Sequence, residues 1–243
     1  MGRHGRAPFG AVRANYPDGS GMPEVQITNP SGGILGGDRL EAEVELAPGS
    51  SATVLTQAAN KAYRGEESLQ ETVVRVGDGA FLEYLPHHLI PYPRSDHRQE
   101  TEFSLTAGAT LIAWDAYAAG RISRGERFVF ARLRARTTIS RDGVPEIVDG
   151  FDLVGHHEHF GGHSYAAAVY VVSPGPLGPL ADALHDAFDG HPDALASASA
   201  PTPNICAVRI LTRDAPTLYR LLNCLRDSAR EFLGLPAAPR EVW

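Results

Sequence analysis

Val44-Glu-Leu-Ala-Pro-Gly49-Ser-Ser-Ala-Thr-Val-Leu55 reads as a strand, a tight glycine turn and a second strand, and this pattern occurs three times in the 243-residue chain. It returns at Val73–Tyr84 and at Phe103–Trp114, with the turn glycines 30 and then 29 residues further on. A period near thirty residues is typical of a stacked array, because one such unit cannot bury its apolar face alone. The repeat predicts that the segments around Gly49, Gly79 and Gly108 stack as equivalent hairpins. Unrelated hairpins with similar turns are the alternative.

Strand patterns continue on both sides of the repeat as far as about residue 172. Runs that alternate, or that are rich in β-branched and aromatic residues, are bounded by Gly, Pro or Asp. The predicted strands are Glu24–Thr28, Leu40–Leu46, Ala52–Gln57, Glu71–Val76, Ala80–Leu85, Gln99–Leu105, Thr110–Tyr117, Arg127–Ile139, Glu146–Leu153 and Tyr165–Val172. The fold class is therefore mainly β, built from stacked sheets.

The periodicity changes in the C-terminal third of the chain. Apolar residues at helical spacing predict one helix near 177–189 and a second near 215–233, separated by a loop over Pro192–Pro203 and a strand at Ile205–Leu211. The second helix has an apolar stripe that suits the core, or a docked partner, and the opposite face is predicted to carry three arginines. These are Arg220, Arg226 and Arg230.

Asn29–Arg64 contains an unusual concentration of glycine just before the repeat. Two glycine pairs bracket Ile34-Leu35 and end on Asp38, which indicates a constrained loop. No lysine follows as a phosphate-binding loop requires, and the next residues, Leu40–Leu46, alternate as a strand, which excludes a dinucleotide fingerprint. An ordinary glycine-rich hairpin loop is the alternative.

Ser31–Arg39 followed by Leu55–Arg64 resembles the signature of the UreD family of urease accessory proteins, called UreH in some organisms. The usual form is Pro-Gly-Gly-x-x-Gly-Gly-Asp and then Thr-Thr-Gln-Ala-Ala-x-Lys-x-Tyr-Arg. Further similarities to the family are Trp114-Asp115, Gly120-Arg121, Gly125-Glu126-Arg127-Phe128 and the closing Pro-Arg-Glu-Val-Trp. The departures are Ser31, Asn60 and Asp115, where the family usually has a small residue, Thr and Glu.

The resemblance implies a stack of β-strands similar to a β-helix or solenoid, with two α-helices in the C-terminal third. It implies a single domain over residues 1–243, with a β-rich part at 1–172 and a helix-containing part at 173–243. The family usually has one or two more strands before these residues, so the first sheet is expected to be shortened.

By the same resemblance, the chain is expected to be a maturation factor for urease and not an enzyme. It would bind apo-urease together with a UreF-like helical protein and a UreG-like GTPase. Nickel would pass transiently into the urease active site, with no tightly bound cofactor here. An interaction module without any role in metal transfer is a further alternative.

The candidate residues for a structural motif or a nickel path come from the glycine motif and the strand that follows it. They are Gly32, Gly33, Gly36, Gly37, Asp38, Gln57, Lys61, Tyr63 and Arg64. Asp38 is either a carboxylate on the path or the acceptor that fixes the loop, and the sequence leaves both roles open. Lys61 is the only lysine of the chain, which suits either a required flexible ammonium or a solvated position.

The histidine-rich segment His156–His163 suggests a rival function. Its four imidazoles, His156, His157, His159 and His163, could offer ligands to a divalent metal such as Ni²⁺. The metalloprotease pattern is excluded because Gly161 stands where the second histidine would be required. The alternative function is an all-β metal-dependent hydrolase, and a solvated histidine-rich loop is the other interpretation.

Composition limits the partners and the compartment. The net charge of −7 and a pI near 5.8 argue against nucleic acid, and no apolar run predicts a signal peptide or a membrane span. A cytoplasmic location is expected. Cys206 and Cys224 are predicted to be reduced core thiols, and His87, His88 and His97 are predicted to lie in a surface loop.

Overall fold

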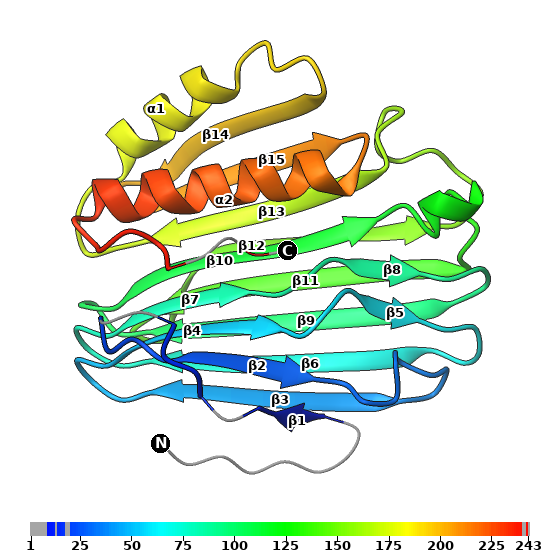
Figure 1. The fold of residues 1–243 in the computed structure, drawn as a ribbon, viewed down its shortest axis with the longest axis horizontal. Coiled ribbons are helices and arrows are strands. Elements are labelled where there is room, and N and C mark those ends of the chain that lie inside the picture. Colours follow the sequence, from blue (N-terminus) through cyan, green and yellow to red (C-terminus); the bar gives the residue numbers. More distant parts are fainter. Residues whose placement is uncertain (1–8, 13, 18–19, 240–241, 243) are drawn as a thin grey trace.

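The computed structural model describes residues 9–12, 14–17, 20–239 and 242, and is mainly β with two helices (Figure 1). The strands form two facing sheets. The ten-stranded sheet contains β1 (Gly10–Ala11), β2 (Glu24–Thr28), β4 (Ser51–Thr56), β5 (Asn60–Ala62), β7 (Phe81–Leu85), β8 (Leu89–Pro91), β10 (Thr110–Ala118), β13 (Tyr165–Val172), β14 (Ala194–Thr202) and β15 (Ile205–Thr212). The five-stranded sheet contains β3 (Arg39–Leu46), β6 (Ser68–Val76), β9 (Asp96–Leu105), β11 (Arg132–Arg141) and β12 (Val144–Val154). The helices are α1 (Gly178–Phe188) and α2 (Ala215–Phe232), with a 3-10 turn η1 at Ile122–Arg124.

The thirty-residue repeat is confirmed as a stack. β3, β6 and β9 pair in parallel in one sheet, while β4, β7 and β10 pair in parallel in the other. The register reproduces the sequence spacing, because Ser51 lies opposite Phe81 and Phe81 lies opposite Thr110. The fold is therefore solenoid-like in this part of the chain.

The prediction that each repeat is a hairpin is wrong. The two strands of a repeat do not pair with each other; they lie in different sheets, so each glycine turn is a corner between the sheets. Gly49 and Gly79 take positive φ values of 68° and 63°, as such corners require. Gly108 differs, because its amide donates to Asp78 Oδ1 at 3.1 Å and a side chain there would overlap that carboxylate.

The molecule has three layers and two apolar interfaces. Inward side chains of the two sheets, such as Val74, Leu82 and Phe103, form the core of the sandwich. On the other face of the ten-stranded sheet, α1 and α2 lie over β13, β14 and β15, and their Leu184 and Leu222 are buried there. Because both faces of its central strands are covered, β7 has no exposed position.

Several element boundaries correct the sequence prediction. The Pro192–Pro203 segment is not simply a loop, since β14 pairs antiparallel with β15 along most of its length. Its Ala/Ser/Pro composition has little strand propensity, and the pairing partner supplies the order. The strand predicted from Arg127 begins at Arg132, because Phe128 has a φ of 51° and interrupts the extended chain. The short strands β5 and β8 were not predicted.

Helix α2 carries its arginines differently from the prediction. Arg220 is exposed, but Arg226 and Arg230 are buried, with relative exposures of 2% and 3%. Both contact the fully buried Glu83 of β7, at 2.9 Å from Arg226 Nε and 2.7 Å from Arg230 Nη1. Burial alone would raise the pKa of Glu83, and hydrogen bonds and charges from Arg226 and Arg230 outweigh it, so the pKa lies below its ordinary value.

Two further side-chain predictions are partly wrong. Cys206 is buried as predicted, whereas Cys224 is exposed on α2. His97 lies fully buried in β9, and its Nδ1 is 2.9 Å from Ser68 Oγ. His88 is also buried, with its Nδ1 2.9 Å from Tyr219 Oη. In the described part of the chain, neither helix combines the length and apolar character needed to span a membrane.

Candidate functional site

The glycine motif forms the loop between β2 and β3, at the right-hand end of the stack in Figure 1. In this loop glycine is needed both for the turns and where another backbone segment packs closely against the loop. A Cβ on Gly33 would lie 2.5 Å from the Lys61 carbonyl oxygen and 2.5 Å from the Tyr63 ring. A Cβ on Gly36 would overlap Gly65 Cα and lie 2.9 Å from the Glu66 amide nitrogen. The first and second halves of the motif are therefore packed backbone against backbone.

Positive φ is required at the other two motif glycines, Gly32 with 79° and Gly37 with 85°. The Asp38 carboxylate accepts the Leu35 amide at 2.8 Å, which closes the turn that contains Gly36 and Gly37. Asp38 thus has the loop-fixing contact that the sequence left open. Its place on a nickel path stays a prediction.

A stacked ladder of side chains continues from this loop across successive repeats. The Tyr63 and Tyr92 rings lie edge to face with centroids 4.9 Å apart, and the Arg121 guanidinium lies 4.6 Å from the Tyr92 centroid. Arg121 also donates two hydrogen bonds to Glu126, at 2.6 and 2.5 Å. Tyr63, Tyr92 and Arg121 are 29 residues apart, so the ladder follows the period of the stack.

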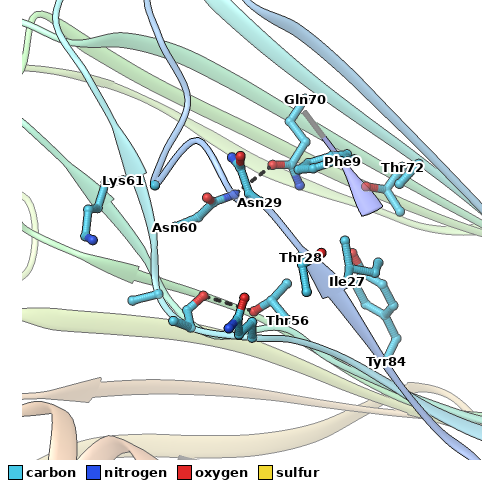
Figure 2. Close-up of a pocket in the computed structure, with 15 residues that line it drawn as sticks. Phe9, Ile27, Thr28, Asn29, Thr56, Asn60, Lys61, Gln70, Thr72 and Tyr84 are labelled. Carbon is cyan, nitrogen blue, oxygen red and sulfur yellow. Dashed lines mark hydrogen bonds between the residues drawn. The ribbon is translucent and has the colours of Figure 1, made fainter. Parts of the chain in front are cut away.

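The remaining motif candidates do not converge on one point. Gln57 is exposed and lines a cavity of about 100 Å³ near the ends of β2 and β4, whereas Arg64 is exposed beside the ladder. Figure 2 shows the Lys61 side chain directed away from the cavity, although the residue contributes to its wall. Asn60, which follows the motif's alanines, donates to Gln70 Oε1 at 3.3 Å inside this cavity.

Gln70, Thr72 and Tyr84 of the cavity wall belong to a longer row of polar side chains between the two sheets. We call this row the polar belt. Its members are Gln70, Thr72, Tyr84, Gln99, Thr101, Asp115, Tyr117, Thr137, Asp149 and Tyr170. In the five-stranded sheet, Thr72, Thr101, Thr137 and Asp149 are successive register partners on four neighbouring strands. The belt crosses the sandwich from the cavity side to the edge formed by β12.

Asp115 lies at the centre of the polar belt with a relative exposure of 5%. Its carboxylate accepts hydrogen bonds from Gln99 Nε2 and Thr137 Oγ1, each at 2.9 Å. Burial raises the pKa of Asp115 to about 6, against the opposing effect of these two hydrogen bonds. None of the described residues forms an ion pair with it. Asp115 is therefore a buried carboxylate held by neutral donors.

At the far end of the belt the charge becomes accessible. Asp149 accepts hydrogen bonds from the Tyr170 hydroxyl and from Arg209, whose guanidinium reaches solvent at the edge between β12 and β15. Gln99 also donates to the Tyr117 hydroxyl at 3.3 Å, which links the centre to the next inward residue of β10. The belt thus joins a neutral cavity to a charged edge through a central carboxylate.

The four histidines of the rival interpretation lie in the loop between β12 and β13. His159 Nε2 lies 2.8 Å from the Val154 carbonyl oxygen, and His163 Nδ1 lies 3.0 Å from that of Phe160. His156 and His157 are exposed. Within the described residues, no three His, Cys, Asp or Glu side chains are grouped so that they could hold a metal ion.

Most of the polar belt was not predicted from the sequence. Asp115 was part of a predicted motif, but the glutamines and threonines that surround it were not. Gln70 and Gln99, and likewise Thr72 and Thr101, are 29 residues apart and interrupt the apolar alternation of β6 and β9 at the same inward positions. Polar residues repeated at the period of a stack were the available signal.

The model of the UreD urease accessory protein family matches residues 1–243. The urease accessory protein UreD of Alkalilimnicola ehrlichii is 30% identical over 99% of this chain and 84% of its own length, and that of Pseudomonas putida is 31% identical over 97% and 85%. The UreD of Trichormus variabilis is 35% identical over 64% of this chain, and the chain spans only 58% of that relative's length. This chain therefore belongs to the UreD family of urease accessory proteins.

Proposed function

We propose that this protein is a non-catalytic scaffold that binds apo-urease, together with a UreF-like protein and a UreG-like GTPase, and assists the insertion of nickel. Family membership gives the role in urease maturation. The observation that carries the finer proposal is the polar belt with Asp115 at its centre. Nickel is the cargo of this process and not a resident cofactor.

A metal ion in transit needs groups that compensate for lost water without holding it permanently. A dication between apolar walls would lose its hydration at a prohibitive cost. A set of several converging imidazoles or thiolates would bind nickel tightly and keep it. The polar belt lies between these extremes, because amides, hydroxyls and phenols surround one central carboxylate.

The charge of Asp115 suits a passing dication. With a pKa of about 6, the group is largely ionised at neutral pH although it is buried. Its neutral donors, Gln99 and Thr137, stabilise the anion and leave no cation to compete with an arriving metal. Asp149 offers a second carboxylate at the edge of the sandwich, where Arg209 partly neutralises it.

The energy and the timing of transfer would come from a partner. The sequence contains no phosphate-binding loop after its glycine pairs, so a GTPase partner supplies nucleotide hydrolysis. The role of this chain is to connect the partners and provide a route between them. The cytoplasm is the compartment in which these components would meet.

Reconstitution tests the proposal. Apo-urease is incubated with nickel, GTP, the UreF-like protein and the UreG-like GTPase, with or without this chain. Nickel per urease active site is measured after gel filtration. We expect loading to require this chain and all four proteins to co-elute before GTP is hydrolysed. Equal loading without this chain, or failure to bind apo-urease in any combination, would contradict the proposed function.

A further inference from the structure

Each residue of the Tyr63–Tyr92–Arg121 ladder is followed closely in the chain by an arginine without an ion pair among the described residues. Arg64, Arg94 and Arg124 are separated by intervals of 30 residues, so each belongs to a successive turn of the stack. All three are exposed, and their guanidinium groups have no ion pair or hydrogen bond within the described part of the chain. We call them the arginine row.

Most other described arginines are neutralised by a carboxylate. On the five-stranded sheet most arginines pair with Glu or Asp across neighbouring strands, as Arg39 does with Glu71 and Arg75 with Glu43. Arg98 pairs with Glu100 of its own strand, and Arg136 has no ion pair among the described residues. Even at the same end of the stack, Arg121 is bound by Glu126 and Arg127 by Glu158. The arginine row therefore places three guanidinium groups without an ion pair among the described residues at one end of the stack, in a protein whose net charge is −7.

Aromatic and apolar side chains lie among these charges. Tyr63 and Tyr92 are partly exposed and stacked on each other, and Leu35 at the tip of the glycine loop is 53% exposed. Tyr and Arg are the residue types that contribute most binding energy at protein interfaces. This composition fits a protein partner better than a simple counter-ion.

The surface is also preorganised by its backbone. Gly33 packs against the Tyr63 ring and Gly36 against Gly65, so the loop and the first rung of the ladder are fixed relative to each other. A surface that is already ordered loses less conformational entropy when it binds. The constrained glycine motif thus supports the ladder and, through it, the arginine row.

We propose that the arginine row, with Tyr63 and Leu35, is a docking surface for an acidic segment of apo-urease. The inference rests on the proposed function and adds the surface and the charge of the partner. Free guanidinium groups select carboxylates, and the net charge of −7 makes nucleic acid a poor alternative.

The position of the surface favours the protein that receives the nickel. The Tyr63 hydroxyl donates to the Gly32 carbonyl at 3.4 Å, and Gly32 is part of the wall of the cavity that shares residues with the polar belt. Tyr63, the first rung of the ladder, therefore lies against the wall of this cavity, and we take the cavity as the opening of the belt nearest to the arginine row. A metal ion leaving by this opening enters the recipient directly only if that recipient covers it.

A matched pair of double variants tests the inference. Arg64→Glu with Arg124→Glu reverses two charges of the row, while Arg75→Glu with Arg136→Glu makes the same change in net charge on the outer face of the five-stranded sheet. Arg75 and its partner Glu43 are both more than half exposed, so loss of that ion pair has a small effect. Circular dichroism verifies the fold of both.

Binding of purified apo-urease and of the UreF-like protein is measured separately by biolayer interferometry at low and high salt. We expect the Arg64/Arg124 variant to associate with apo-urease at least about tenfold more slowly at low salt, and the Arg75/Arg136 variant to change by less than about threefold. Arg64→Lys with Arg124→Lys, which keeps the charge, should retain most of the rate.

The outcomes separate the two proposals. If the wild-type chain binds apo-urease and both double variants bind equally well, the docking surface is wrong while the proposed function stands. Loss of UreF-like binding in place of apo-urease binding also overturns the assignment, as does tight binding of duplex DNA by the wild-type chain at physiological salt. If the wild-type chain fails to bind apo-urease at all, the proposed function itself fails.

Discussion

Glycines of the same motif are required for two different physical reasons. Gly32 and Gly37 adopt positive φ, as do the corner glycines Gly49 and Gly79. Gly36 has no such dihedral requirement but lies against the Gly65 backbone, where no Cβ fits. The sequence indicated a constrained loop, yet it could not show which glycine serves which purpose, because both reasons exclude side chains alike.

Alanine substitution separates these reasons. Gly49→Ala introduces only the strain of a left-handed alanine, because nothing lies within 4 Å of its new Cβ, and should lower the free energy of unfolding by about 1 kcal/mol. Gly36→Ala must move one backbone segment away from another, so we expect a loss of more than about 2 kcal/mol. Urea unfolding measures both. Equal losses would contradict the close-approach account.

Asp115 gives a prediction about pH. Its pKa rises from 3.8 to about 6 on folding because the carboxylate is buried, so the folded state binds the proton more tightly than the unfolded state. Stability is then highest while the group is protonated, and falls as pH rises from about 4 to about 6. The Asp115→Asn variant does not lose this stability, because the asparagine side chain does not ionise. We expect the variant to gain up to about 3 kcal/mol over the wild type above pH 6, and little at pH 4.

The difference in stability between wild type and Asp115→Asn isolates the contribution of Asp115 to the pH dependence. Burial lowers the pKa of His88 and of His97 to about 4, so both proteins lose stability below pH 6.5 for reasons unrelated to Asp115. That contribution cancels in the difference between variant and wild type. Unfolding free energies at pH 4, 5, 6 and 8 provide the measurement, and a difference that does not depend on pH would contradict a buried, ionised Asp115.

Helix α2 is attached to the ten-stranded sheet by apolar contacts and by a buried charge cluster. Glu83 on β7 receives Arg226 and Arg230 from the helix and Thr53 from β4 at 2.8 Å. Glu83 and Arg230 are separated by 147 positions in the chain. An arginine at helical spacing gives no local sign that its partner lies in a strand so far away, so the sequence placed these arginines on the wrong face.

Removing one member of the cluster should be more harmful than removing all of them. Glu83→Gln leaves two buried guanidinium groups without their carboxylate, and we expect a loss of about 3–5 kcal/mol in unfolding free energy. The triple variant Glu83→Leu, Arg226→Met and Arg230→Met contains no buried charge and should recover most of this loss. Urea denaturation of both variants tests the prediction. A triple variant less stable than Glu83→Gln would contradict it.

Strands with a regular pattern were predictable and strands defined by their neighbours were not. β3 alternates along its length, and its predicted and observed limits differ by one residue. β14 consists mostly of Ala, Ser, Pro and Thr, and it is a strand because β15 pairs with it. The sequence prediction was wrong for the arginine-containing face of α2 and for β14 for the same reason. In each case a segment distant in the chain determines the structure.

For the whole molecule, the repeat period predicted the stack and its register, but not how the strands of each repeat are divided between two sheets. A strand, a glycine turn and a second strand describe a hairpin and a corner between sheets equally well, because the local pattern is the same. The difference decides where the inward side chains point. Only once β3, β6 and β9 form one wall and β4, β7 and β10 the other do the polar side chains around Asp115 meet as a belt.

We propose that nickel passes along the polar belt, and the nickel content per urease active site measures this passage. Cells carry wild-type chain, Asp115→Asn or Asp38→Asn, with co-purification of the UreF-like protein and apo-urease as the control for assembly. Asp38→Asn keeps an oxygen acceptor for the Leu35 amide, so we expect full loading. Asp115→Asn removes the buried charge, so we expect intact complexes whose urease contains less than about one tenth of the normal nickel. Full nickel loading with Asp115→Asn would contradict the account.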